Sequence, residues 1–196
     1  MHNVDVVVGV VSMDAVQVFR DFFDCCVGNW VTERTYHYLT HELVERSHTE
    51  FVIHPLSPVL KQKVITDNEY PMLGDLTHYP GYHLSFETVS ETGEKAAHDL
   101  NMLFVYEQSG DLLIGDYLRD RAYEEAKPMI AKFQFDPALR ELRMKTTYTR
   151  VVAVDTITMV NPNLRIRKII NYHRPPEGRP LKDVALVGFG VEQKQV

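Results

Sequence analysis

The sequence has few cysteines and no apolar run long enough to cross a bilayer. Its two cysteines, Cys25 and Cys26, are adjacent. Neighbouring side chains on a helix point in different directions, so this pair cannot form a disulfide without distortion and lacks the spacing of metal ligands. The apolar stretch Val4–Val11 is too short to span a membrane, and it lacks the basic region and cleavage site of a signal peptide. We therefore expect an intracellular protein in a reducing compartment.

Positive charge is also scarce, because 21 Lys and Arg stand against 27 Asp and Glu and give a formal net charge of -6. This balance argues against nucleic-acid binding by phosphate neutralisation. The nine histidines form neither an HExxH motif nor a paired Cys/His set, so no metal site is predicted. No Ser/His/Asp motif, phosphate loop or dinucleotide fingerprint is present, which leaves hydrolytic and redox chemistry without support.

The chain of 196 residues, 44% of them hydrophobic and 24% charged, is typical of one globular domain. We expect an N-terminal tail or short edge strand over residues 1–12 and a single domain over residues 13–196, with Met13 as an alternative start. From Ser12 the pattern becomes helical, with Ser12 as N-cap, Asp14 in the first turn and Gly28 as the stop. One face of this helix is apolar and must be covered: Phe19, Phe22, Phe23 and Cys26. Because a helix C-terminus disfavours a thiolate, Cys26 is predicted to pack rather than to act as a nucleophile.

After Gly28 the sequence is rich in β-branched and aromatic residues, in runs separated mostly by Gly, Pro, Asn, Asp or Ser. The predicted strands are Trp30–Leu39, His48–Leu56, Val59–Thr66, Gly81–Val89, His98–Tyr106, Leu112–Asp116, Met129–Phe135, Leu139–Tyr148, Arg150–Val160, Leu164–Tyr172 and Asp183–Glu192. About ten strands with few helices predict a closed antiparallel barrel or a sandwich. The order of the elements favours a barrel plugged at one end by the aromatic helix.

Two connecting segments and a pair of glycines lead to further predictions. Asn68–Pro80 is predicted to be a long loop across a barrel mouth, either a lid or a disordered excursion. Arg119–Ala126 is predicted to be a short helix or an irregular crossing segment. Gly188 and Gly190, in the last strand, would let another backbone or side chain approach closely.

The segment Asn161–Lys168 is a turn at Pro162 followed by a strand that begins with two arginines one residue apart. Alternation places four side chains on one face of this strand: Arg165, Arg167, Ile169 and Asn171. Two guanidiniums side by side can bind a pair of carboxylates or phosphates. Alternation alone slightly favours the other reading, in which the arginines face water and the isoleucines of the opposite face pack the core.

Asp155 lies in an otherwise apolar strand just before the Pro162 turn. It is either solvated on an outer face or buried with a partner, because an unpaired buried charge is too costly. If the turn pairs the two strands, Asp155 and the arginines share one cavity, where the acid could protonate a ligand nitrogen. Weaker candidates for the pocket are Trp30, Arg34, Tyr36, His37, Tyr82, His83 and Phe86.

Several motifs, in order over roughly residues 13–192, resemble the S/U-type phycobiliprotein bilin lyases. They are Phe22-Phe23-x4-Gly28-Asn29-Trp30-x3-Arg34-Thr35-Tyr36-His37, Ser47-His48-Thr49-Glu50, Gly115-Asp116-Tyr117-Leu118-Arg119-x3-Tyr123 and Asn161-Pro162-Asn163-Leu164-Arg165-Ile166-Arg167. Gly28-x-Trp30 after a helix also resembles the calycin signature of lipocalin-type barrels. The resemblance implies a mainly β fold, a ten-stranded antiparallel lipocalin-like barrel closed by an N-terminal helix.

The resemblance further implies an enzyme without a permanent cofactor that binds an open-chain bilin, phycocyanobilin or phycoerythrobilin. Such lyases transfer the bilin to a cysteine of an apo-phycobiliprotein α or β subunit, in the cyanobacterial cytosol or plastid stroma, as a homodimer or with a sister lyase. The double-arginine motif falls on Arg165 and Arg167 and implies binding of the bilin propionates. The family's acidic residue falls on Asp155, where relatives usually have Glu. Trp30, Arg34, His37, Tyr82 and Phe86 complete the implied bilin site.

The sequence departs from the family pattern at three places. Tyr82-His83-Leu84-Ser85-Phe86 stands where many relatives have a tryptophan, Thr158 replaces a second tryptophan, and Ile169 replaces a small hydroxyl residue. Two alternatives to a lyase stay open at this point. One is a non-catalytic lipocalin-like carrier of a linear tetrapyrrole, haem or lipid, and the other is a lyase subunit that binds no bilin by itself.

Overall fold

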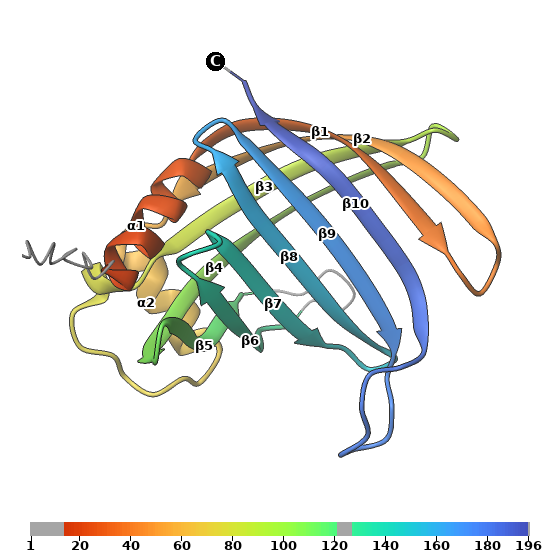
Figure 1. Ribbon diagram of the computed structural model, residues 1–196. Coiled ribbons are helices and arrows are strands. Elements are labelled where there is room, and N and C mark those ends of the chain that lie inside the picture. The colour runs from red at the N-terminus through yellow and green to blue at the C-terminus, as the bar shows by residue number, and fades with distance from the viewer. Residues whose placement is uncertain (1–13, 121–126, 196) are drawn as a thin grey trace, which may run out of the picture.

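The computed structural model describes residues 14–120 and 127–195, and the ten strands within them close into an antiparallel barrel (Figure 1). Each strand pairs with its neighbours in sequence, and β1 pairs with β10 to complete the ring. The strands are β1 (Gly28–Tyr38), β2 (Leu43–Pro55), β3 (Gly81–Ser90), β4 (Lys95–Ser109), β5 (Leu112–Arg119), β6 (Met129–Asp136), β7 (Glu141–Thr147), β8 (Val151–Asn161), β9 (Leu164–His173) and β10 (Val184–Lys194). The predicted antiparallel barrel is confirmed, and closure of the ring excludes a sandwich.

Helix α1 (Ala15–Cys26) packs its aromatic face against residues at one end of the barrel. Its N-cap is Asp14, whose Oδ1 accepts hydrogen bonds from the backbone N–H groups of Val16 and Gln17. Asp14 therefore caps the helix instead of lying in its first turn, because a short carboxylate satisfies the free N–H groups there. Ser12, Met13 and the predicted tail lie outside the described residues, as do residues 121–126 of the segment predicted at Arg119–Ala126.

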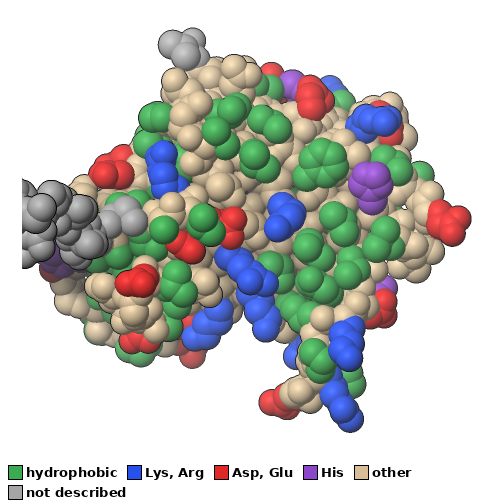
Figure 2. All heavy atoms as spheres, viewed as in Figure 1, with side chains coloured by type: hydrophobic (Ala, Val, Ile, Leu, Met, Phe, Trp, Pro, Cys, Tyr) green, Lys and Arg blue, Asp and Glu red, His purple; other side chains and the backbone are tan. Residues whose placement is uncertain are grey.

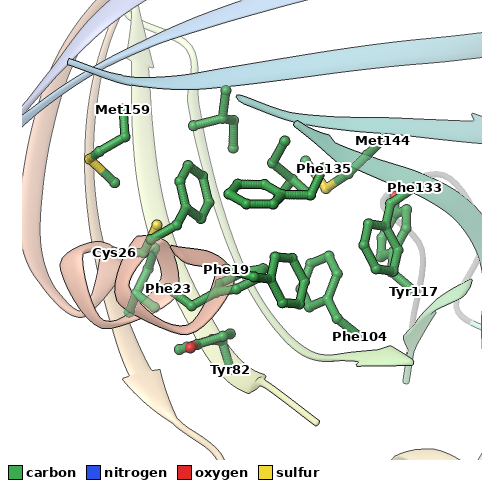
Figure 3. Packing of buried hydrophobic residues seen from close by; sticks show 14 of the residues in the cluster. Phe19, Phe23, Cys26, Tyr82, Phe104, Tyr117, Phe133, Phe135, Met144 and Met159 are labelled. Atoms are coloured by element: carbon green, nitrogen blue, oxygen red, sulfur yellow. The ribbon is translucent and has the colours of Figure 1, made fainter. Parts of the chain in front are cut away.

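Aromatic rings join α1 to the strands beneath it (Figure 3). The ring of Phe19 stacks on Phe133 at 5.7 Å between centroids and lies 5.0 Å from Phe135. Phe23 stacks on Tyr82 at 5.0 Å and lies 4.7 Å from Phe104. These partners come from β3, β4 and β6, so the helix packs across one side of the ring and ties several of its strands together.

The predicted strand at Val59–Thr66 is wrong, because these residues form helix α2 (Pro58–Asp67). Ser57 caps the helix by accepting a hydrogen bond from the N–H of Leu60, and Pro58 occupies the first turn, where its missing N–H costs nothing. The apolar residues of α2 pack on the outside of the barrel, over β4 and β5: Val64 and Ile65 against Leu103 and Leu118. A capping signal thus outweighs the β-branched composition. Neither helix in the described part of the chain is long and apolar enough to cross a membrane.

The loop Asn68–Pro80 lies beside α2 against the outside of the barrel, which corrects the prediction that it crosses a barrel mouth. Lys61 of α2 donates hydrogen bonds to the backbone carbonyls of Leu76 and Tyr79. Tyr70 donates to the Asp116 carboxylate on β5. These bonds and the contacts of the loop with the α2 cluster hold it against the wall, and none of its residues lines the internal cavity.

Strands β9 and β10 partly reverse the usual pattern, since several of their apolar side chains face outward. Ile166, Phe189 and Val191 are exposed, the last two by about half (52% and 53%), and Val191 pairs with Ile166. Apolar side chains are visible on the outer face that these strands help to form (Figure 2). Charged residues and glycines hold many of the inward positions, which they share with Ile169 of β9 and Leu186 of β10.

Candidate functional site

The barrel encloses a cavity of about 390 Å³, within the range of small-ligand pockets (roughly 300 to 1,000 Å³). Phe22, Phe23 and Cys26 of α1 line it at the closed end. Aliphatic and aromatic side chains form much of the wall, among them Leu84, Met102, Phe104, Leu142, Met144 and Ile157. Arginines and a carboxylate from β1, β8 and β9 interrupt this surface, so the cavity suits a largely apolar ligand that carries acidic groups.

Two glycines of β10 make room for side chains of β1. In the sheet register Tyr36 of β1 pairs with Gly188, and Arg34 pairs with Gly190. A Cβ atom on Gly188 would lie 2.5 Å from the Tyr36 ring, and one on Gly190 would lie 3.1 Å from Cγ of Arg34. The prediction that these glycines permit a close approach is confirmed, and the approaching groups include Tyr36 and Arg34, whose side chains line the cavity.

Arg165 and Glu192 form a buried ion pair at the closed end of the barrel. The Arg165 Nε donates to Glu192 Oε2 at 2.5 Å, and the Arg34 Nη2 donates to Glu192 Oε1 at 3.3 Å. The Arg165 guanidinium also lies over the Trp30 ring, 4.5 Å from its centroid. Trp30 in turn donates from Nε1 to the carbonyl of Cys26, at the C-terminus of α1. The pair is thus connected to the helix through the tryptophan.

Three arginines determine the charge state of Glu192. Burial by itself would raise the pKa of its carboxyl group, which has no exposed surface, but the charges of Arg165, Arg167 and Arg34 outweigh burial and hold the pKa below its usual value. Glu192 is therefore a carboxylate at neutral pH.

Asp155 of β8 and Arg167 of β9 form a second ion pair, which is partly accessible from the cavity. The Nε and Nη2 of Arg167 both donate to Asp155 Oδ1, at 3.1 and 2.9 Å. Both residues line the cavity, and the exposed fraction of the side chain is 18% for Arg167 and 17% for Asp155. Of the two readings of Asp155, the buried one with a partner is therefore correct, and the arginines point inward.

A further arginine lines the cavity from β5. The Nη2 of Arg119 donates to the hydroxyl of Tyr148 at 3.1 Å, and the guanidinium lies 5.4 Å from the ring centroid of Tyr117 and 5.7 Å from that of Tyr148. Tyr117 and Thr146 share a short hydrogen bond beside it. This group adds polar contacts to a wall otherwise rich in apolar side chains.

A family model described as "CpeS-like protein" matches residues 18–195. The chain belongs to the CpeS-like family. It is 60% identical over 183 residues to "Chromophore lyase CpcS/CpeS 1" of Synechococcus sp. (strain JA-3-3Ab), covering 93% of this chain and 99% of that protein. It is 26% identical to "Chromophore lyase CpcS/CpeS" of Thermosynechococcus vestitus (strain NIES-2133 / IAM M-273 / BP-1), over 77% of this chain and 82% of the relative. The resemblance to bilin lyases predicted from the sequence motifs is confirmed.

The CpeS-like fold agrees with a solved structure. The S-type phycobiliprotein lyase CPES from Guillardia theta superposes with a TM-score of 0.71 at 17% identity, over 91% of this chain and 93% of that one. At this level of identity the likeness establishes the fold alone. The predicted lipocalin-like barrel of ten antiparallel strands is therefore confirmed both by its own topology and by this comparison.

Most of the predicted site residues of this CpeS-like chain line the cavity: Arg34, Tyr36, Tyr82, Phe86, Asp155, Arg165 and Arg167. Trp30 is buried beneath Arg165 and is not among the lining residues. His37 is exposed on the outer face, because β1 points Arg34, Tyr36 and Tyr38 inward and alternation turns His37 away. His83 also lies outside the lining and bonds Asn101 and Ser85.

Residues of the site that the sequence-based prediction missed include Glu192, Tyr38 and Arg119. Alternation would have found Tyr38, since it shares a face with Arg34 and Tyr36. Arg119 lies in a family motif and shares the inward face of β5 with Tyr117, which was a usable signal. Glu192 follows two inward glycines at a spacing of two, but without the register of β10 against β9 nothing indicates that it meets an arginine.

Replacing Glu192 with Gln is expected to lower the free energy of unfolding at pH 7 by about 3 kcal/mol, because Arg165 is left buried without its carboxylate. Since the pKa of Glu192 is lower in the folded than in the unfolded chain, its contribution is present above the unfolded value, about 4.3, and is lost as the pH falls through the folded value. The difference between parent and variant, measured by urea unfolding, should therefore shrink below about pH 4.

The exposed Glu107, replaced by Gln, is the control for removal of one negative charge, and its effect should stay below about 0.5 kcal/mol. A difference between parent and Glu192→Gln that stays constant from pH 7 to pH 3 would contradict the assigned charge state.

Proposed function

We propose that this chain is a phycobiliprotein chromophore lyase that holds an open-chain bilin in the barrel cavity and delivers it to a cysteine of an apo-phycobiliprotein subunit. The observation that carries the proposal is an aromatic cavity lined by arginines and Asp155, in a chain 60% identical to a protein named as a chromophore lyase. The family match over residues 18–195 supports the same reading.

The chemistry of the cavity fits that of a bilin. An open-chain tetrapyrrole presents a conjugated, largely apolar ring system, two propionates and a row of pyrrole nitrogens. The apolar wall and the rings of Phe86 and Tyr82 suit the ring system of the bilin. The arginines suit its propionates through charge-assisted hydrogen bonds. Asp155 offers the acid–base group beside them that a pyrrole nitrogen requires.

The proposed reaction is an addition in which the lyase acts mainly by holding the bilin in one conformation. The acceptor thiolate attacks the exocyclic carbon of the ring A ethylidene, where a C–S bond forms as the π bond breaks. A proton then ends on the adjacent ring carbon, so atoms and electrons balance without an oxidant. Asp155 exchanges a proton with a bilin nitrogen and so sets the electrophilicity of the ethylidene.

The cysteines of the chain have no part in this scheme. Cys26 lines the cavity, but burial raises the pKa of its thiol and outweighs the opposing effect of Arg165. A protonated thiol is a poor nucleophile, which leaves bond formation to the acceptor.

We propose phycocyanobilin or phycoerythrobilin as the ligand. Of the departures from the family pattern, the segment Tyr82–Phe86 lines the cavity through Tyr82, Leu84 and Phe86, and Ile169 also lines it, whereas Thr158 bonds Glu141 away from it. This segment and Ile169 are therefore the positions at which bilin preference would differ from that of relatives. The relatives come from Synechococcus and Thermosynechococcus, which supports action in a cyanobacterial cytosol or plastid stroma. We further propose that the chain works as a homodimer or beside a sister lyase.

The function is tested by incubating the chain with phycocyanobilin or phycoerythrobilin and separate apo-α and apo-β subunits. We expect covalent colour on one acceptor subunit that survives denaturation, at a rate above that of the bilin and acceptor alone. Colour retained only by this chain would reject the lyase and favour a carrier.

Replacing Asp155 with Asn should change the visible spectrum of the bound bilin, because the ligand loses the group that exchanges its proton. It should also slow transfer by a factor of about 100, the low end of general acid–base contributions. Absorbance spectra of the complex and single-turnover transfer rates check both effects. The exposed Asp111, replaced by Asn, is the control. An unchanged spectrum with an unchanged rate would exclude the acid–base role.

A further inference from the structure

Among the arginines that line the cavity, Arg34, Arg165 and Arg167 differ in how far their side chains are enclosed. We propose that Arg34 and Arg167, on either side of Gly190, form the carboxylate-binding subsite, whereas Arg165 stabilises the closed end of the barrel. The inference deepens the proposed function and rests on it. It separates the two arginines of the Arg165-Ile166-Arg167 motif, which alternation and family resemblance treat as equivalent.

Arg165 has its partners within the protein. Its side chain retains 4% exposure, its Nε donates to Glu192, and its guanidinium is stacked over Trp30 and lies 5.2 Å from the ring centroid of Phe51. Breaking this pair to bind a ligand would leave Glu192 buried with only the longer contact from Arg34. Arg165 is therefore held in place by the fold and is a poor ligand donor.

Arg34 has donor capacity that the fold does not use. Its Nη2 donates to Glu192 at 3.3 Å, but its Nε is buried and has no hydrogen-bond partner within residues 14–120 and 127–195. Arg34 lines the cavity, and 13% of its side chain is exposed. A buried donor without an acceptor is costly, and a ligand carboxylate would remove that cost.

Gly190 positions Arg34 relative to Arg167. The register places Arg34, Gly190 and Arg167 in one row across β1, β10 and β9, so the two arginine backbones are about 10 Å apart with no side chain between them. A Cβ on Gly190 would lie 2.8 Å from Thr32 Oγ1 and 3.1 Å from Arg34 Cγ. The glycine is what allows Arg34 to lie across β10.

Arg167 is oriented without being fully enclosed. Both of its contacts with Asp155 are to a single carboxylate oxygen, and its side chain keeps more exposure than that of either other arginine of the group. The subsite therefore combines two oriented guanidiniums with a gap between them, which suits a ligand with one carboxylate for each.

The test compares phycocyanobilin with its dimethyl ester, which keeps the ring system and removes both charges. Dissociation constants come from absorbance titration of the full chain and its variants. The parent should prefer the diacid, and Arg34→Gln and Arg167→Gln should each reduce that preference about tenfold while affinity for the diester stays the same. Gly190→Ala should reduce the preference in the same direction by displacing Arg34.

Arg165→Met is the matched comparison. This change should lower the thermal midpoint of unfolding and weaken the binding of diacid and diester by the same factor. The ratio of the two dissociation constants should therefore stay that of the parent. The subsite would be overturned if Arg34→Gln kept the parent's preference for the diacid over the diester. It would also be overturned if Arg165→Met folded but lost that preference. If Arg165→Met does not fold, the ratio for Arg34→Gln decides. If the variants do not show the predicted diacid-to-diester affinity ratios but the parent still transfers bilin, the subsite alone is rejected. If the parent binds neither the diacid nor the diester, the proposed function is rejected as well.

Discussion

The buried carboxylate of Glu192 is the constraint on which the rest of the site depends. A carboxylate with no exposed surface is tolerated only if cations meet it, and here Arg165 and Arg34 do so from β9 and β1. The two strands flank β10 in the ring, so the ion pairs hold three adjacent strands in register. Charged side chains in turn point inward on β9 and β10, whereas Ile166, Phe189 and Val191 of these strands face outward.

The same contacts connect the closed end of the barrel to its cavity. Arg165 lies on Trp30, and Trp30 bonds the last carbonyl of α1, so the helix that closes the barrel is tied to the charged cluster. The second pair, Asp155 and Arg167, lies farther from this packed end and lines the cavity. The first pair is thus enclosed by the fold, and for the second, which reaches the cavity, we propose acid–base chemistry and anion binding on a bound ligand.

Sequence patterns predicted much of this arrangement but left the direction of β9 undetermined. Alternation correctly placed Arg165 and Arg167 on one face, yet it slightly favoured the outside, because an outward Ile166 is an exception to the usual pattern. Glu192 was missed because its partner Arg34 is far away in sequence, and only the register brings the two together. Helix α2 was missed because its β-branched residues favoured a strand, although Ser57 and Pro58 form a helix-capping signal.

If the buried pair organises this end of the barrel, Arg165 and Glu192 are energetically coupled. A double-mutant cycle with Arg165→Met, Glu192→Gln and the combined variant, read by urea unfolding at pH 7, measures this directly. We expect the combined variant to be more stable than the sum of the single effects implies, with a coupling of at least about 1.5 kcal/mol, because each single change leaves a buried charge with weakened compensation. Effects that add within about 0.5 kcal/mol would contradict the claim.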